Sequence, residues 1–235
     1  MINYFYQILE VEWLEIKLDS SLCAAIPGFK AGIIHYKGIE VGDSPQMLRG
    51  RLQLFQESIY FDLEDQSVTE RPGIQEWRQI FKAVGKDPNR YRHAAEALFR
   101  RIKKQNYLQP INSAIDLNNF FSLQYEVPIG LYDLDKLSGD IVIRIGASGE
   151  EYEGLNGRSN SLENLIISAD DNGGFGSPFV DSTKANVIPG TTSALQIIYL
   201  RPSLPLDECN ALTESLMNMF TQINGGEANF QVLGC

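Results

Sequence analysis

Hydrophobic residues recur along the chain with two different periods, and these periods predict its secondary structure. Apolar positions three or four residues apart are typical of amphipathic helices. Short runs rich in β-branched residues and bounded by glycine or proline are typical of strands. Helices are predicted over residues 44–60, 74–84, 93–104, 111–125 and 206–223. Strands are predicted over residues 12–18, 30–39, 140–145, 165–168, 186–188, 194–200 and 229–233.

The order of these elements indicates the fold class. Helices gather in the first half of the chain and strands in the second, which favours an α+β fold over a doubly wound parallel one. Residues 1–87 form a helix-rich part with two strands, and residues 88–235 contain the remaining elements and the C-terminal helix. Because no linker-like stretch separates the two parts, we expect one compact domain.

Charge bears on the class of partner. The chain has 30 acidic and 20 basic residues, a formal net charge of -10, which disfavours nucleic acid unless basic residues gather locally. One such cluster exists, and it fits either a solvated helix face or a contact surface. Its members are Arg90, Arg92, Arg100, Arg101, Lys103 and Lys104.

Several classes of site and location receive little support. The three cysteines, Cys23, Cys209 and Cys235, are odd in number and form no CxxC pair, so neither a disulfide framework nor a metal site is predicted. His35 and His93 are interpreted as ordinary packing or surface residues. Without a signal-peptide pattern or an apolar stretch of ~18 residues, we expect a cytoplasmic protein without membrane association, metal or cofactor.

A polar stripe on the predicted helix 111–125 is the first candidate site. Asn112, Asp116 and Asn119 fall within a ~60° arc of a helix, bordered by apolar Ile115 and Phe120. Buried amides and carboxylates need partners, or each costs ~1–3 kcal/mol. The stripe therefore either lines a pocket for a polar ligand or holds the adjoining loops by hydrogen bonds.

Two further segments carry candidate residues. Pro128 and Gly130 predict a rigid turn that can face a cleft, followed by Asp133, which suits either a carboxylate site or a cap. Residues 169–183 are rich in glycine, which permits close approach of the backbone to a ligand, although the spacing of a phosphate-binding loop is absent. This segment equally suits a plain surface connection.

Several short motifs follow one another from about residue 88 to residue 200. They are HAAEALFRR at 93–101, PINSAIDLNN at 110–119, PIGLYDLDKL at 128–137, GDIVIR at 139–144, Gly149–Glu150 and ADD at 169–171. In sequence, order and spacing they resemble stand-alone members of the B3/B4 domain family of the bacterial phenylalanyl-tRNA synthetase β subunit.

The resemblance implies a mixed sheet with flanking helices and an editing pocket that hydrolyses mischarged aminoacyl-tRNA without a metal. It implies that ligand-binding residues surround one cleft. By residue number these are Asn112, Asp116, Asn119, Pro128, Gly130, Asp133, Arg144 and Glu150. Such a pocket works by positioning a water and the ester carbonyl with hydrogen-bonding groups.

The chain also departs from the family. Many stand-alone relatives have a basic and aromatic stretch after ADD, whereas this chain has GGFGSPF at 173–179. No synthetase motif for ATP and amino-acid activation is found, so a complete tRNA ligase is not expected. Three hypotheses remain open: a free-standing binder or hydrolase of mischarged aminoacyl-tRNA, a non-catalytic binding module for an amino acid or small metabolite, and a structural or subunit-contact role without a ligand. The expected partner is accordingly tRNA, an aminoacyl ester or an amino acid.

Overall fold

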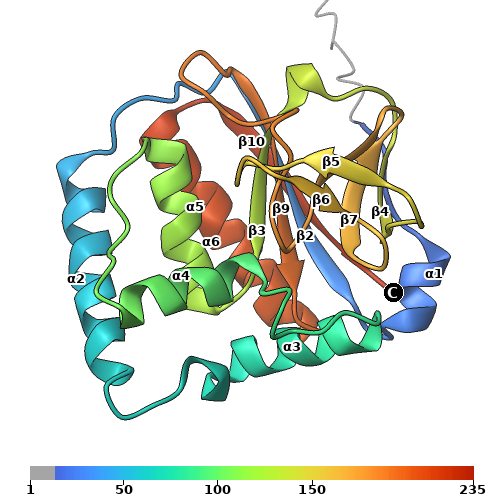
Figure 1. Cartoon of the computed structure of the whole chain (residues 1–235). Coiled ribbons are helices and arrows are strands. Elements are labelled where there is room, and N and C mark those ends of the chain that lie inside the picture. The colour runs from blue at the N-terminus through green and yellow to red at the C-terminus, as the bar shows by residue number, and fades with distance from the viewer. Residues whose placement is uncertain (1–13) are drawn as a thin grey trace, which may run out of the picture.

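The structure, a computed structural model, describes residues 14–235, whose course is drawn in Figure 1. The described part begins with a strand, a short helix and a long strand, and then forms most of its helices before the remaining strands. The elements in chain order are β1 (Ile16–Leu18), α1 (Ser20–Ala25), β2 (Lys30–Lys37), α2 (Gln46–Asp62), η1 (Val68–Glu70), α3 (Pro72–Ala83), α4 (Ala94–Lys103), α5 (Ser113–Tyr125), β3 (Ile129–Asp133), η2 (Leu134–Lys136), β4 (Ile141–Ile145), β5 (Glu151–Glu153), β6 (Ser159–Ser161), β7 (Ile166–Asp170), β8 (Gly173–Gly176), β9 (Ser193–Leu200), α6 (Leu206–Asn224) and β10 (Glu227–Gly234).

A four-stranded antiparallel sheet in the order β10-β2-β9-β3 forms the middle of the molecule. Strand β2 lies inside it and is paired along its whole length, from Lys30 opposite Leu200 to Lys37 opposite Ser193. Both faces of β2 and β9 are buried, which explains their near-continuous apolar sequences. We call this sheet the central sheet.

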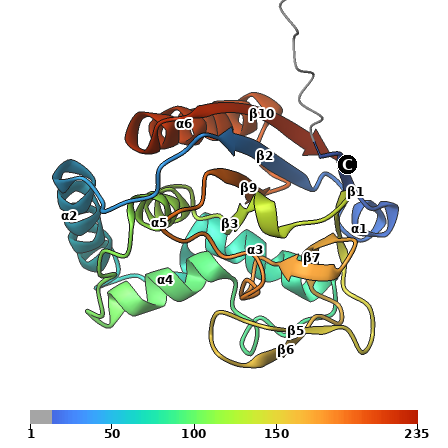
Figure 2. The same ribbon diagram turned by 90° about the horizontal axis from the view of Figure 1, so that it is seen from above.

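Successive residues of the central sheet point to opposite faces and so belong to two different cores. On one face, Ile34 and Ile198 pack with residues of α2, α5 and α6. On the other face, Ile33 and Ile197 pack with residues of a second sheet, in the order β1-β4-β7-β8. Figures 1 and 2 show these layers, with α2, α5 and α6 on one side of the central sheet and the second sheet, α1 and most of α3 on the other.

The fold confirms the expected α+β class and the single compact domain. Strands β1 and β2 come from the first part of the chain, yet they pair with β4, β9 and β10 from the second part. Because strands from both parts of the sequence share the same sheets, the two parts cannot be separate domains. The division of the sequence at residue 87 itself stays a prediction.

The predicted elements mostly match the observed ones, with corrections. The five predicted helices correspond to α2, α3, α4, α5 and α6. Residues 186–188 do not form a strand, and only a single bridge joins Asn186 to Tyr132. The predicted strand at 12–18 survives as β1, while residues 12–13 lie outside the described part of the chain.

The expectation that the cysteines form no disulfide is wrong. Cys23 of α1 and Cys235, which follows β10, are joined by a disulfide across a sequence separation of 212 residues. No local spacing pattern could have indicated this pair, because the two cysteines become neighbours only when the fold brings α1 and the end of β10 together. Cys209 is a free thiol buried in α6.

Candidate functional site

The polar stripe of α5 is partly used to hold the fold. Asn112 is the N-cap, and its Oδ1 accepts a hydrogen bond from the Ile115 N–H at 2.9 Å. The buried Asp116 carboxylate accepts one from the Ser44 hydroxyl at 2.5 Å and one from the Ile111 N–H at 3.0 Å. For these two side chains, the interpretation that they hold adjoining loops describes the observed contacts. A ligand-binding role stays a prediction.

Asn119, the third member of the stripe, is half-buried and makes no side-chain hydrogen bond within residues 14–235. Its neighbour Asn118, which sequence reasoning missed, connects α5 to the central sheet. The Asn118 amide donates to the Ile129 carbonyl at 2.9 Å and accepts from the Gln196 amide at 2.9 Å. Gln196 in turn accepts from the Tyr36 hydroxyl at 2.7 Å, so a chain of polar groups crosses the apolar core.

Pro128 and Gly130 do not form the predicted turn. Gly130 lies inside strand β3, and Pro128 directly precedes it, with its carbonyl accepting a hydrogen bond from the Tyr199 N–H at 3.0 Å. Both residues are buried. A Pro-x-Gly sequence normally indicates a turn, but proline is tolerated beside an edge strand, and β3 is the edge of the central sheet.

Asp133 ends β3 and is buried. One carboxylate oxygen accepts from the Asp135 N–H at 3.2 Å, which caps η2, and the other accepts from the Thr191 hydroxyl at 2.8 Å. Lys136 lies 3.3 Å from the same carboxylate. The capping interpretation therefore describes Asp133, and its partners connect β3 to the chain segment that leads into β9.

Arg144 and Glu150 form a two-pronged ion pair, with distances of 2.9 and 2.6 Å. The Glu150 carboxylate also accepts from the Ala147 N–H at 3.0 Å. Hydrogen bonding to Arg144 lowers the pKa of Glu150, and the same contact raises the pKa of Arg144. The pair closes the turn after β4, so each charge is already matched by the other.

The eight predicted site residues therefore fall into separate groups. Asn112, Asp116 and Asn119 are on α5, which packs on the helix side of the central sheet. Arg144 belongs to β4, in the sheet that packs on the opposite side. That all eight residues surround one cleft stays a prediction.

A cluster of polar groups lies between the two sheets. The Tyr132 hydroxyl donates to the Asp181 carboxylate at 2.7 Å and lies 3.3 Å from the Tyr199 hydroxyl. The Tyr199 hydroxyl lies 2.9 Å from the Ser168 hydroxyl, and the Ser177 N–H donates to Asp181 at 3.1 Å. We call these five residues the intersheet cluster.

Burial changes the acidity of the intersheet cluster. Removal from water raises the pKa of Asp181 to about 6 against the opposing effect of its hydrogen bonds from Tyr132 and Ser177. Burial, followed by the nearby Asp181 charge, raises the pKa of Tyr132 well above its ordinary value. Asp181 is thus a carboxyl group able to change charge near neutral pH, a property that is common at functional sites.

Sequence reasoning missed Asp181 although it had selected the segment that contains it. The selection rested on the glycines of residues 169–183, of which Gly173–Gly176 form β8 rather than an open loop. An aspartate flanked by Val180 and Ser182 carries no periodic signal of its own. Asp181 reaches Tyr132 only because the segment after β8 folds back against β3.

The histidines confirm their interpretation as packing residues. His93 is fully buried against Trp77 and Phe81, and its Nδ1 accepts from the Glu96 N–H at the start of α4. Burial and the charge of Arg78 lower the pKa of His93 to about 3. His35 is buried in β2, and burial lowers its pKa as well.

Two other sequence expectations concern metals and membranes. Across residues 14–235, His, Cys, Asp and Glu side chains nowhere gather in a group of three that could hold a metal ion. The helices in that same range are each too short or too polar to span a membrane.

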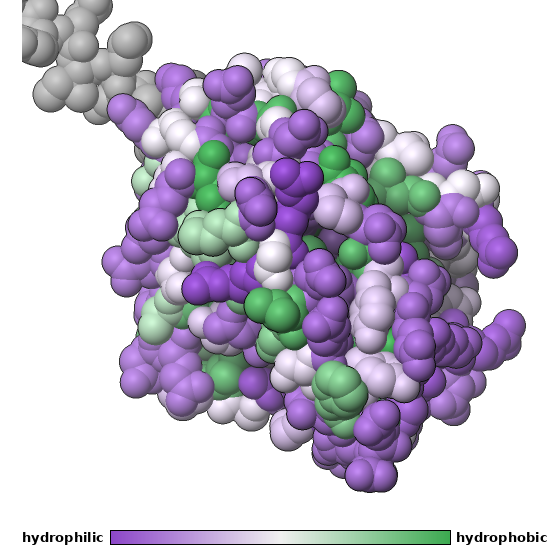
Figure 3. Space-filling view, turned by 90° about the vertical axis from the view of Figure 1, so that its left-hand side faces the viewer, coloured by the Kyte–Doolittle hydropathy of each residue, from purple (hydrophilic) through white to green (hydrophobic). Residues whose placement is uncertain are grey.

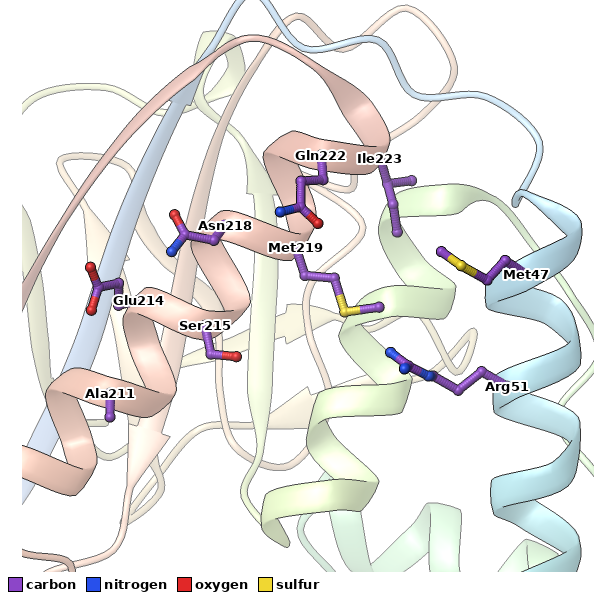
Figure 4. Close-up of a pocket in the computed structure, with 9 residues that line it drawn as sticks. All are labelled: Met47, Arg51, Ala211, Glu214, Ser215, Asn218, Met219, Gln222 and Ile223. Carbon is purple, nitrogen blue, oxygen red and sulfur yellow. The ribbon is translucent and has the colours of Figure 1, made fainter.

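A surface groove of about 710 Å³ runs between α2 and α6. In Figure 4, Met47 and Arg51 point from α2 toward Met219 and Ile223 of α6. The face that carries α2 is mostly hydrophilic, with hydrophobic residues in separate spots (Figure 3). None of the eight predicted residues lines this groove.

A second cavity, of about 310 Å³, adjoins the start of α5. Ser113, directly after the capping Asn112, lines it together with Gly42 and Asn224. The Ser113 N–H donates to the Gly42 carbonyl at 2.8 Å, which holds the cavity wall to the helix. This is the nearest described opening to the polar stripe along the chain.

Comparison with known proteins places these features in a family. Residues 76–202 match the B3/4 domain, which is more than half of the chain. The chain belongs to the B3/4 domain family. All eight predicted residues, and the intersheet cluster as well, lie within the part that matches B3/4. The motifs recognised between residues 88 and 200 are therefore confirmed as B3/4 motifs.

Relatives of this B3/4 chain fall into two groups by length. It is 35% identical to the uncharacterized protein YhzB of Bacillus subtilis over 214 residues, which is 91% of this chain and 96% of YhzB. It is 39% identical over 67 residues to the phenylalanine–tRNA ligase β subunit of Paramagnetospirillum magneticum, 28% of this chain and 8% of the subunit. The corresponding subunit of Bifidobacterium longum is 33% identical over 107 residues, 45% of this chain and 12% of the subunit.

One solved structure is similar over most of the B3/4 chain. It is an N-terminal fragment of the phenylalanyl-tRNA synthetase β subunit from Pyrococcus horikoshii, with 13% sequence identity and a TM-score of 0.43. The similarity covers 91% of this chain and 50% of the fragment. The match to YhzB thus covers nearly the whole of both proteins, whereas the matches to the two synthetase subunits cover only about a tenth of each subunit.

Proposed function

We propose that this protein binds the aminoacylated end of a tRNA and hydrolyses the ester bond of mischarged tRNA, as a free-standing editing protein. The observation that carries the proposal is the B3/4 match over residues 76–202, which includes every residue that the family resemblance assigns to a binding pocket. Among the relatives of the chain are β subunits of phenylalanine–tRNA ligase. Because the chain spans only about a tenth of those subunits, ligation itself is not proposed.

The chemistry expected of such a site suits the groups present. Ester hydrolysis without a metal requires donors that hold the carbonyl and an acceptor that orients water. The half-buried Asn119 amide has both a donor N–H and an acceptor oxygen. It makes no side-chain hydrogen bond within residues 14–235, so binding a ligand would break none. We assign Asn119 to the ligand, and Asn112 and Asp116 to positioning the helix that carries it.

Purified protein should release tyrosine from tyrosyl-tRNA of the phenylalanine type faster than buffer alone. Correctly charged phenylalanyl-tRNA should be spared.

Asn119→Ala should lower the rate about tenfold or more while leaving the thermal midpoint unchanged, because the side chain holds no neighbour. Asn112→Ala is the matched control: loss of a cap should lower stability by about 1 kcal/mol. Hydrolysis at the buffer rate with several mischarged tRNAs would overturn the catalytic proposal.

A second candidate function is a non-catalytic binding module for an amino acid or small metabolite. The net charge of -10 favours a small ligand over a polyanion, apart from local basic surface. An amino acid present at 100 times its dissociation constant should add ~2.7 kcal/mol to the stability. If none of the twenty amino acids raises the thermal midpoint, this candidate fails.

The proposal includes a cytoplasmic location, where aminoacyl-tRNA is used. Disulfides such as Cys23–Cys235 are uncommon in reducing compartments. Trapping free thiols in intact cells before lysis therefore tests the location. Two protected cysteines under these conditions would speak against a reducing cytoplasm as the working environment.

A further inference from the structure

Positive charge is concentrated in one stretch of an otherwise acidic chain. Residues 78–104 carry nine Lys or Arg and two Asp or Glu, a net charge of +7. The rest of the chain carries eleven basic and 28 acidic residues, a net charge of −17. A solvated helix face normally carries both positive and negative side chains, so this separation of positive from negative charge indicates a specific role for the positive stretch.

The fold gathers this stretch on one side of the molecule. It runs from the second half of α3, through the connecting loop, to the end of α4, and the two helices lie next to each other at the bottom of Figure 1. Arg78 of α3 contacts the Glu96 carboxylate of α4 at 3.1 and 3.2 Å, and Arg100 contacts it at 2.8 Å. Glu96 is fully buried, so the single acid of α4 adds no negative charge to the surface.

Five further cations of this stretch are exposed, whereas Lys86 is half-buried over the Tyr91 ring. Within the described residues, none of the following side chains makes an ion pair or hydrogen bond: Lys82, Arg90, Arg92, Arg101 and Lys104. On α4, Arg100, Arg101 and Lys104 fall within a ~100° arc that faces away from the buried side. The second acid, Asp87, is occupied as a turn acceptor for the Asn89 N–H at 2.9 Å.

Acidic residues limit the surface at one end. Lys103 donates to the Gln66 carbonyl at 2.8 Å, which brings the end of α4 next to the segment after α2. Glu64 and Asp65 belong to that segment, Asp62 ends α2 just before it, and all three are exposed. The unopposed positive surface therefore extends from Arg101 toward Arg90 and Arg92, a distance of about one ten-residue helix, ~15 Å.

We propose that this surface, formed by α3, the 84–93 loop and α4, binds the phosphodiester backbone of RNA. A row of unpaired cations needs a partner whose negative charges are also arranged in a row, and a nucleic-acid strand has one per nucleotide. Three of the unpaired cations are arginines (Arg90, Arg92 and Arg101), and a fourth arginine, Arg100, is partly exposed beside Glu96. The planar guanidinium group of arginine can bind two phosphate oxygens at once. The acidic remainder of the chain repels RNA, so only this side can face it. The inference rests on the proposed function, for which it names the surface that holds the tRNA.

Two triple variants with equal change in charge test the surface. Arg90→Gln/Arg92→Gln/Arg101→Gln removes three free cations from it. Lys37→Gln/Arg49→Gln/Arg158→Gln removes three exposed cations that lie elsewhere and also form no ion pair in the described structure. The probe is deacylated bulk tRNA, with affinity measured by fluorescence anisotropy from 20 to 200 mM salt.

The first triple variant should bind tRNA at least about tenfold more weakly at low salt. The slope of log affinity against log salt should become shallower by about 2–3, since each phosphate contact contributes ~0.7–0.9. The control variant should stay within about twofold of the unaltered protein in both respects. Arg90→Lys/Arg92→Lys/Arg101→Lys, which keeps the charge, should retain most of the affinity.

Three outcomes would overturn the inference. One is an equal loss in the two triple variants, which would mean that only net charge matters. Another is absence of salt-dependent tRNA binding by the unaltered protein. The third is tighter binding of poly-glutamate than of tRNA, which would indicate an acidic protein as the partner.

The inference and the proposed function can fail separately. If tRNA binding depends on the surface but no ester is hydrolysed, the surface stands and the editing activity falls. If the first triple variant hydrolyses mischarged tRNA with an unchanged KM, the editing activity stands and the surface is not its tRNA contact.

Discussion

At the scale of single residues, the ring of Tyr132 determines what its neighbours can be. Tyr132 follows Gly130 by two positions and so shares its face of β3. A methyl group on Gly130, or on Gly176 of β8, would overlap the Tyr132 hydroxyl group. Two glycines on different strands are therefore required by one tyrosine. The need for glycine at 130 comes from this packing and not from a turn.

Gly130→Ala should lower the free energy of unfolding by about 1–3 kcal/mol, because the tyrosine must leave its position. In Gly130→Ala/Tyr132→Leu the obstructing hydroxyl is gone, so the loss should be smaller than the sum of the two single losses by about 1 kcal/mol or more. Urea denaturation of the four proteins measures this coupling. Simple additivity would mean that the alanine methyl group is accommodated some other way.

Asp181→Asn should change how stability depends on pH. The folded-state pKa of Asp181, about 6, lies above its ordinary value of 3.8, so between these values the folded chain binds more protons than the unfolded chain. Ionisation of Asp181 therefore costs stability as pH rises from about 4 to 6. The total is about 2–3 kcal/mol by the linkage relation and stays constant above pH 7.

The asparagine variant keeps an oxygen acceptor for Tyr132 and Ser177 but cannot ionise. Relative to the unaltered protein, it should gain stability progressively between pH 4 and 6. Urea titrations at pH 4.5, 5.5 and 7.5 make the comparison. Parallel pH profiles for the two proteins would show that Asp181 is not the group responsible.

At the scale of elements, periodicity sufficed for the helices but not for all strands. Helix α5 was predicted over residues 111–125 and is observed over Ser113–Tyr125. Strands β3 and β8 were not, because Pro128, Gly130 and the glycines of 173–176 are local turn signals that tertiary packing overrides. The residues of the stripe could be named in advance. That Asn112 and Asp116 would be occupied by the chain itself, and that Asp181 would meet Tyr132, required the fold.

Helix α2 offers a test of local propensity. Gly50 lies inside it, and a methyl group there would meet nothing within 4 Å. Gly50→Ala should raise the free energy of unfolding by about 0.5–1 kcal/mol, because alanine restricts the unfolded chain.

Gly73→Ala in α3 is the contrasting case: the added methyl would collide with Glu126, whose carboxylate accepts from the Gly73 N–H at 2.7 Å. That variant should lose stability, and a gain in it would contradict the packing argument.

At the scale of the whole molecule, the Cys23–Cys235 disulfide connects the two ends of the described chain. Strand β10 is the outer strand of the central sheet, and its C-terminal end is held by pairing with β2, by a hydrogen bond from the Cys235 N–H to the Phe29 carbonyl and by the disulfide. A covalent link across 212 residues removes many conformations from the unfolded chain. This stabilisation acts mainly through the unfolded state.

Cys23→Ser/Cys235→Ser should lower the free energy of unfolding by about 3–5 kcal/mol, the range expected for closing a long loop. Adding a reductant to the unaltered protein should cause a similar loss in urea denaturation. The same reductant should leave the double variant unchanged, which separates the disulfide from any effect on the buried Cys209. A reductant-insensitive unaltered protein would contradict the pairing.

The separation of charge between residues 78–104 and the remainder gives the molecule a large electric dipole moment. Its positive end lies at α4, although the protein as a whole carries a net charge of -10. The electric field of an approaching polyanion orients such a molecule before contact, so the polyanion meets its positive end preferentially. It should also be retained at neutral pH by both anion-exchange and heparin columns, whereas an evenly charged acidic protein of this size would be held by the first alone.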